Sequence, residues 1–223
     1  MTRGTPEYIE AVQRVKIDFF TEPWGMGWDI KGILHVGTND GYEMQFYRSM
    51  GIEHLAGVEP LPSAIAKFRD KYHDIPLLEF ALSDYNGNAP LIVVLPGDGQ
   101  GSSLYKESTP HPDYDYSTTV QVEVRRGDSL NLDWSLYDCM VMDVQGMELQ
   151  ALKGFGERLK GFRMLSIECS IDPVYVGEAP ASEVEAYLAS MGFERKTPLE
   201  VHNDVFFVRR DADRGGVLTG VGC

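Results

Sequence analysis

The sequence contains few cysteines, and they do not form pairs. Cys139, Cys169 and Cys223 are odd in number, and their spacing matches neither a disulfide framework nor a zinc site. Cys139 and Cys169 stand inside apolar runs. We therefore expect both to be small, buried core residues in a reducing compartment.

Long apolar runs are absent as well. No stretch of about 18 apolar residues occurs, and the first residues lack the apolar core of a secretory signal. We therefore expect a cytoplasmic protein with no membrane contact.

Basic residues are scarce. Lys and Arg number 20 against 34 Asp and Glu, which gives a formal net charge of −14. General nucleic-acid binders carry a basic surface, so we do not expect nucleic acid as a partner. The 223 residues, of which 43% are hydrophobic and 24% charged, suffice for one globular domain with a full core.

The pattern along the chain predicts a main domain over 31–210. Before it, 1–30 would hold an amphipathic helix, at 7–20, and a connector rich in Gly and Trp. After it, the glycine-rich 211–223 would be a flexible tail. The oligomeric state is left open, with a homodimer as one alternative.

Short apolar runs alternate with segments of helical periodicity. The runs predict strands at 32–37, 54–59, 77–82, 91–95, 119–124, 137–143, 162–169, 193–196 and 204–209, and the periodicity predicts helices at 42–50, 62–72, 146–153 and 181–191. This alternation is typical of an α/β, Rossmann-like fold with a mostly parallel sheet and helices on both faces. Ligands bind such sheets beyond the carboxyl ends of the strands, at the switch in strand order.

The first strand is followed by a turn with two glycines, Gly37 and Gly41. Such a turn lets a ligand approach the backbone closely and aims amides at a negative group, although any strand-to-helix turn can use glycine. It is not a GxGxxG motif, because Asn39 stands in the middle position, and it is not a P-loop, because no Lys-Ser/Thr pair follows.

Two acidic residues follow the next strands. Glu59 comes directly after the second strand, where a carboxylate accepts hydrogen bonds from both hydroxyls of a ribose; the alternative is a surface glutamate. Asp84 either accepts from an adenine amine or caps a turn beside Asn86 and Gly87.

The segment 143–148 follows a strand and opens a helix. Asp143 is placed at the strand end and faces the expected ligand crevice. Glu148 falls in the first turn of the helix, where stabilisation of the helix end is at least as good an explanation as catalysis.

These motifs together resemble those of one family. The sequences HVGTNDGYE, GVEP, ALSDYNG, GSSL and DVQGMELQALKG, in this order, are similar to the FkbM-type S-adenosylmethionine-dependent methyltransferases over 32–209. The resemblance implies the seven-stranded class I methyltransferase sheet. It also implies methylation of hydroxyl oxygens of sugars or of natural products, with S-adenosylmethionine as cofactor.

The resemblance also implies roles for single residues. Gly37, Asn39 and Gly41 would line the methionine part of the cofactor, Glu59 would hold the ribose, and Asp143 would lie beside the methyl donor. Ala81, Leu82 and Asp84 would border the adenine. The remaining cofactor contacts are expected from His35, Thr38, Glu43 and Pro60, although His35 is also expected to be buried within its strand. Gln145 stands where the family commonly has glutamate, so no base is assigned there.

Transfer of a methyl group to an alcohol benefits from a general base, because the hydroxyl has a high pKa. Asp143 is the first candidate, and its charge would balance that of a sulfonium. His202, in the expected turn before the last strand, and Glu168, at a strand end, are the second candidates, although a lone loop histidine is more often inert. Asp143 and Glu168 could supply oxygen ligands to a metal, but no dense ligand cluster is visible, so no metal is expected.

The segment 96–117 is a long loop with several aromatic residues and glycines. A loop of this length is usually a lid, a binding loop or a disordered segment. Its aromatic rings would suit a sugar ring or an apolar natural product. The expected contacts to the acceptor are Ser102, Ser103 and Tyr105.

Three other functions were weighed against O-methylation. N-methylation by the same fold is a variant that the sequence does not exclude. A nicotinamide-dependent oxidoreductase would require a GxGxxG turn and a Tyr-x-x-x-Lys pair, and neither occurs. A non-catalytic binding module would have lost residues such as Glu59 and Asp143, and both are present.

Overall fold

The computed structural model describes residues 30–96 and 99–212 of the chain. The expected helix at 7–20, the connector and most of the expected tail, including Cys223, lie outside the described residues. In the part that is described, no helix is both long enough and apolar enough to cross a membrane.

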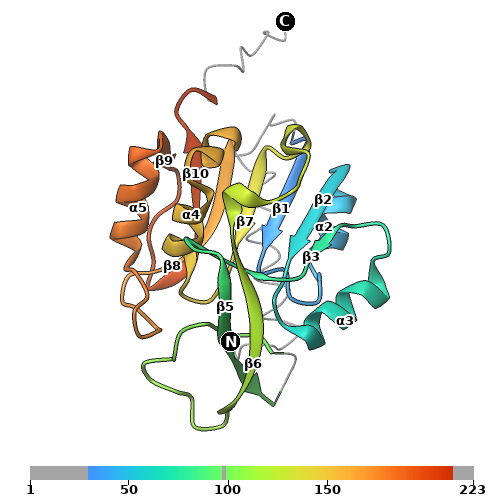
Figure 1. Ribbon diagram of the computed structural model, residues 1–223. Coiled ribbons are helices and arrows are strands. Elements are labelled where there is room, and N and C mark those ends of the chain that lie inside the picture. The colour runs from blue at the N-terminus through green and yellow to red at the C-terminus, as the bar shows by residue number, and fades with distance from the viewer. Residues whose placement is uncertain (1–29, 97–98, 213–223) are drawn as a thin grey trace, which may run out of the picture.

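A seven-stranded sheet forms the centre of the domain, in the order β3-β2-β1-β7-β8-β10-β9 (Figure 1). Its strands are β1 (Gly32–Val36), β2 (His54–Val58), β3 (Leu77–Leu78), β7 (Cys139–Met142), β8 (Met164–Ser170), β9 (Phe193–Arg195) and β10 (His202–Arg209). All neighbouring strands are parallel except β10, which is antiparallel to both β8 and β9. The chain builds outward from β1 to β3 and then returns to β7, so the switch in strand order lies between β1 and β7.

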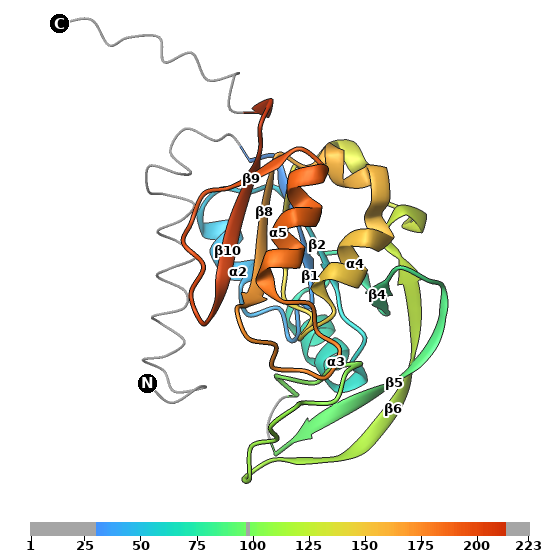
Figure 2. The same cartoon turned by 90° about the vertical axis from the view of Figure 1, so that its left-hand side faces the viewer.

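Helices cover both faces of this sheet (Figure 2). The α-helices are α2 (Met44–Ser49), α3 (Pro62–Lys71), α4 (Glu148–Phe155) and α5 (Ala181–Ser190), and short 3₁₀ helices span Gly127–Ser129, Trp134–Leu136 and Gly156–Gly161. One core cluster joins α4 and α5 to the sheet, and a second joins α2 and α3 to the opposite face. The expected class I arrangement is therefore confirmed.

The cysteines of the central strands are buried, as expected. Cys139 and Cys169 are free thiols with 1% and 4% of their surface exposed. Burial raises the pKa of both thiols, so they behave as apolar core residues.

The expectation of a single strand over 77–82 is wrong. Leu77–Leu78 pairs with β2, whereas β4 (Ala81–Ser83) leaves the large sheet and pairs with β6 in a smaller one. Both faces of this second piece are buried, because Ala81 packs inside the small sheet while Leu82 packs into the main core. A continuous apolar run does not reveal that its two halves have different partners.

The small sheet has the order β4-β6-β5 and contains a long hairpin of β5 (Gly87–Leu95) and β6 (Asp115–Arg126). This hairpin projects beyond the carboxyl edge of the large sheet (Figures 1 and 2). Strand β6 begins earlier than expected, so the loop predicted to reach residue 117 ends before 115. Its first residues are mostly exposed and polar, and they are held by antiparallel pairing rather than by burial, so no hydrophobic pattern marks them.

Candidate functional site

The carboxyl ends of β1 and β7 lie side by side at the switch in strand order. Val36 is paired with Met142, and the Asp143 amide donates to the Val36 carbonyl at 3.0 Å. A Cβ atom at Gly37 would stand 1.7 Å from the Asp143 carbonyl oxygen. Only glycine fits at position 37. Because glycine has no side chain, the loop after β1 can contact the loop after β7 directly.

The loop after β1 is held open by left-handed backbone at Gly37, Asn39 and Gly41, whose φ angles are 80°, 48° and 76°. Asparagine is among the few non-glycine residues that adopt this conformation readily. The hydroxyl of Thr38 is buried in this loop and has no hydrogen-bond partner among the described residues. A buried polar atom left in this state is suited to a ligand that supplies the missing partner.

Glu59 lies one residue beyond β2 and is 6% exposed. Its two carboxylate oxygens accept from the amides of Asn39 at 2.9 Å and Leu61 at 2.8 Å. Burial raises the pKa of Glu59 to about 7; the two amides lower it, and the charge of Asp143 raises it further. Ionised carboxylates have about four acceptor positions, so two remain for a ligand such as a diol.

The other expected cofactor residues are spread around this loop. His35 is buried within β1, as its strand position implied, and its Nδ1 lies 3.1 Å from the hydroxyl of Tyr47 on α2. Glu43 and Pro60 are half-buried, and Ala81 and Leu82 are buried in β4. Asp84 is exposed beside the turn that leads into β5. Whether these residues touch a cofactor stays a prediction.

The turn after β7 has a second stretch of left-handed backbone. Gln145 and Gly146 have φ angles of 55° and 95°. The helix that was expected to begin at Gly146 therefore begins at Glu148. The Glu148 carboxylate accepts from the amides of Val144 at 3.0 Å and Gly146 at 3.3 Å. This geometry favours a capping role for Glu148, and burial, together with the charge of Glu168, raises its pKa well above the usual range.

All three expected catalytic residues belong to one hydrogen-bonded chain. The side-chain amide of Gln145 donates to Asp143 Oδ1 and, at 2.9 Å, to Glu168 Oε2. Glu168 Oε1 in turn lies 2.9 Å from His202 Nε2. Asp143 and His202, which are far apart in the sequence, are thus linked through Gln145 and Glu168.

His202 is not in the turn before the last strand, as was expected, but is the first residue of β10. Strand β10 starts there because His202 pairs with Ser170 of β8. Its Nδ1 lies 2.8 Å from the Ser170 hydroxyl. With both ring nitrogens engaged, His202 has a defined orientation; its role in catalysis stays a prediction.

The carboxylates of Asp143, Glu148 and Glu168 offer oxygen atoms within 4.8 Å of one another. No dense ligand cluster was visible in the sequence, where only Asp143 and Glu168 were considered together; the structure adds Glu148 to them. An acidic cluster alone does not define a metal site. We assign none, and the expected absence of a metal stays a prediction.

The expected acceptor residues lie in the loop between β5 and β6. The Ser102 hydroxyl accepts from the Val94 amide at 3.1 Å, and the buried Ser103 hydroxyl donates to the Gln145 carbonyl at 2.6 Å. Tyr105 is half-buried, and its ring lies within 3.9 Å of where a Cβ of Gly177 would be. The two hydroxyls therefore also hold this loop against β5 and against the turn after β7.

Sequence reasoning missed the residues that connect this network. Gln145 was noted only for not being an acid, and Tyr175 was not singled out. The Tyr175 hydroxyl donates to Gln145 Oε1 at 2.6 Å, and its ring covers Gly146, where a Cβ would be 2.8 Å from the nearest ring atom. The Asn39 and Gln145 positions share one usable signal: each is a polar residue within two positions of a glycine, in the turn that follows a buried strand.

These residues fit S-adenosylmethionine. The unpaired Thr38 hydroxyl, the glycine-lined turn and the spare acceptor positions of Glu59 supply partners for an amino acid and a ribose. Asp143, one residue beyond β7, supplies negative charge at the adjoining strand end, where a sulfonium would be favoured.

Solved structures share the fold. The PH0226 protein of Pyrococcus horikoshii OT3 superposes with a TM-score of 0.53 at 9% identity, over 93% of each chain. CalS10, an amino pentose methyltransferase of Micromonospora echinaspora with S-adenosylmethionine bound, superposes with a TM-score of 0.51 at 12% identity, over 93% of each chain.

One relative is more similar to this chain in sequence than these structures are. The 2-O-methyltransferase NoeI of Sinorhizobium fredii (strain NBRC 101917 / NGR234) is 29% identical over 190 residues, which cover 78% of this chain and 77% of NoeI. The model of the methyltransferase FkbM domain matches residues 35–195. With the class I sheet and most of the chain covered by that match, the protein belongs to the FkbM family of S-adenosylmethionine-dependent methyltransferases.

Proposed function

We propose that this methyltransferase acts on a hydroxyl oxygen of a sugar or of a secondary metabolite, and that Asp143 is the general base. The observation that carries the proposal is the position of Asp143. It lies at the switch in strand order, in contact with Gly37 of the loop that fits the cofactor, and it is linked to Glu168 through Gln145.

Bound S-adenosylmethionine supplies an activated methyl group, so the chain has to position the acceptor, exclude water and take up a proton. Asp143 would take the proton of the acceptor hydroxyl as the oxygen–methyl bond forms and the sulfur–methyl bond of the donor breaks, with S-adenosylhomocysteine as the leaving group. His202 holds Glu168, Glu168 holds Gln145, and Gln145 in turn orients Asp143. Glu59 binds the ribose, and the turn at Gly37, Thr38 and Asn39 binds the methionine part.

Three observations support a hydroxyl-rich acceptor that is not strongly anionic. The relative NoeI is a 2-O-methyltransferase, and the structural neighbour CalS10 is an amino pentose methyltransferase. The chain's net charge of −14 disfavours strongly anionic acceptors. Tyr105, half-buried beside the site's loops, offers an aromatic face of the kind that stacks on sugar rings.

The test has two stages. Calorimetric titration with S-adenosylhomocysteine first measures binding at the proposed cofactor site, with NAD as the comparison ligand. Mass spectrometry then follows methyl transfer from S-adenosylmethionine to matched pairs of sugars that carry either a hydroxyl or an amino group at the same carbon. A second panel contains natural-product alcohols.

We expect binding of S-adenosylhomocysteine, no binding of NAD, and methylation of the hydroxyl member of a pair. Methylation of the amino member alone would replace the proposal with N-methylation. Binding of S-adenosylhomocysteine without transfer to any acceptor, across both panels, would instead support a binding module that has kept the fold.

A further inference from the structure

Gln145 occupies the centre of the proposed site. Its amide nitrogen donates to Asp143 Oδ1 and Glu168 Oε2, and its amide oxygen accepts from the Tyr175 hydroxyl at 2.6 Å. The opposite amide orientation would point the oxygen at two carboxylates and the nitrogen at a hydroxyl donor, so the network permits one orientation. All functional atoms of this side chain are therefore used in holding other groups.

The backbone of Gln145 is held as firmly as its side chain. Its left-handed φ of 55° costs conformational energy for a residue with a side chain, and such a conformation persists only where the surroundings impose it. Here the buried Ser103 hydroxyl donates to the Gln145 carbonyl at 2.6 Å, and the Tyr175 ring packs over Gly146. The two loops that border the site thus set the position from which the Gln145 amide reaches the carboxylates.

These two loops also pair with each other. The Val176 amide donates to the Lys106 carbonyl at 2.8 Å, and the Ser108 amide donates to the Val174 carbonyl at 2.9 Å. A change in either loop is therefore passed to Gln145 through Ser103 or Tyr175.

Gln145 is suited to this position by its neutral charge as well as by the length of its side chain. Asp143, Glu148 and Glu168 already place three carboxyl groups within 4.8 Å of one another. An amide nitrogen can donate one hydrogen to each of two carboxylates, whereas a carboxylic acid has one hydrogen at most and, when ionised, adds to the repulsion.

We propose that Gln145 is a positioning residue of the methyl transfer reaction, which holds the carboxylates of Asp143 and Glu168 side by side and couples their orientation to the loops that carry Ser103 and Tyr175. This inference rests on the proposed function, since it gives Gln145 its role through Asp143.

Several titratable groups surround Gln145, and any pH dependence measured at the site includes them. They come from the turn after β7, from α4, from β8, from β10 and from the loop after β8: Asp143, Glu148, Glu168, His202 and Tyr175. These groups are the same in variants that differ only at Gln145, so a difference between the pH curves of such variants reports the substitution.

The experiment measures how strongly the protein prefers the cationic S-adenosylmethionine over the neutral S-adenosylhomocysteine, by calorimetry between about pH 5 and about pH 8. This ratio reports the negative charge beside the sulfonium and needs no acceptor. The variants are Gln145→Glu and Gln145→Asn. Asparagine keeps a neutral amide and tolerates a left-handed backbone, but it is too short to span both carboxylates. The matched control is Gln121→Glu, the same charge change at an exposed position on β6.

In the wild-type protein we expect the preference for S-adenosylmethionine to fall as the pH falls. In Gln145→Glu the midpoint of this fall should move to higher pH by about one unit, because the added carboxylate repels the carboxylates of Asp143 and Glu168. Gln145→Asn should shift the midpoint less, in the same direction, and the control should follow the wild-type curve.

Superposition of the Gln145→Glu and wild-type curves, with both proteins folded, would overturn the inference, because a merely structural role changes stability but not this midpoint. If Gln145→Glu does not fold, an unshifted Gln145→Asn curve has the same consequence. Absence of binding of either ligand to the wild-type protein would overturn the proposed function, and the inference with it.

Discussion

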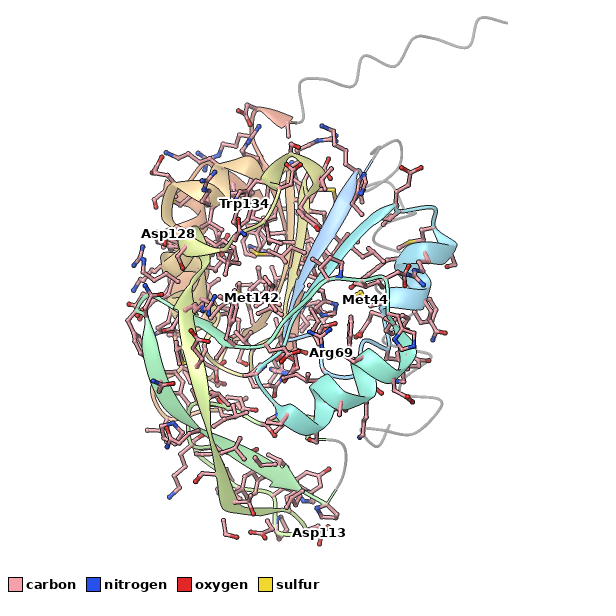
Figure 3. All side chains as sticks on the ribbon, turned by 45° about the vertical axis from the view of Figure 1, so that its right-hand side comes forward. Met44, Arg69, Asp113, Asp128, Trp134 and Met142 are labelled. Carbon is pink, nitrogen blue, oxygen red and sulfur yellow. The ribbon has the colours of Figure 1, made fainter. Side chains whose placement is uncertain are left out.

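Glu168 and His202 face each other across the antiparallel strands β8 and β10, with Glu168 Oε1 2.9 Å from His202 Nε2. The Ser170 hydroxyl, 2.8 Å from His202 Nδ1, fixes the other side of the ring. This pair stands at one end of a chain of hydrogen bonds that leads through Gln145 to Asp143. Asp143 directly follows Met142, the last residue of β7, which is labelled in Figure 3.

Replacing the anchoring histidine should slow the reaction without preventing cofactor binding. His202→Ala removes one hydrogen-bond partner from Glu168, and a hydrogen bond to a charged group contributes about 1.5 to 3 kcal/mol. We therefore expect kcat to fall about tenfold or more, with an unchanged Kd for S-adenosylhomocysteine. His73→Ala, at an exposed position, is the control. A wild-type kcat in His202→Ala would show that the anchor does not act on the reaction.

Asp143→Asn should have the largest effect on turnover. The amide keeps the size of the side chain but cannot take up a proton, so we expect kcat to fall by about 10² to 10⁴. The variant should still bind S-adenosylhomocysteine. Asp70→Asn, exposed on α3, is the matched control, and steady-state kinetics together with calorimetry provide the measurement. Normal turnover in Asp143→Asn would rule out Asp143 as the base.

Glu59 should make stability depend on pH. Its pKa is about 7 in the folded protein against an ordinary value of 4.5, because burial disfavours the charged form. Between these values the unfolded chain has already released the proton, so the unfolding free energy falls as the pH rises. Relative to the wild type, Glu59→Gln should gain stability by about 3 kcal/mol across this window, as measured by urea denaturation.

The same residue should make cofactor binding depend on pH. Ribose hydroxyls donate to the ionised carboxylate, so the affinity for S-adenosylhomocysteine should fall below about pH 7, by up to about tenfold per unit. Glu59→Gln should bind more weakly at pH 8 and lose this dependence. Equal affinities of the two proteins at that pH would contradict the ribose role.

Gly37 and Gly51 have the same φ angle, so alanine substitutions at the two positions distinguish the cost of backbone strain from the cost of a steric clash. Gly37 and Gly51 both have a φ of 80°, but a Cβ at Gly37 meets the Asp143 carbonyl oxygen at 1.7 Å, whereas Gly51 has nothing within 4 Å. Gly51→Ala should cost about 1 to 2 kcal/mol from the backbone alone. Gly37→Ala should cost more and should also abolish binding of S-adenosylhomocysteine. Equal unfolding free energies for the two variants would contradict the importance of the contact between β1 and β7.

The local sequence was sufficient to predict a strand where the whole apolar run belongs to one buried strand. The strands β1, β2, β7 and β8 are short apolar runs, and their positions were predicted to within a few residues. It failed where an apolar run changes partner, as at 77–82, and where a strand is held by pairing alone, as at the start of β6.

Strand ends, glycine turns and acidic residues are local features of the chain, and they were enough to predict the class of fold, the family and the places where chemistry is expected. Which of these residues lie together depends on contacts between distant segments. The register of β8 with β10 brings His202 to Glu168, and the left-handed turn after β7 carries Gln145 to both carboxylates. Pairing between distant segments depends on strand register and on the loops around the strands, and neither can be predicted from a single stretch of sequence.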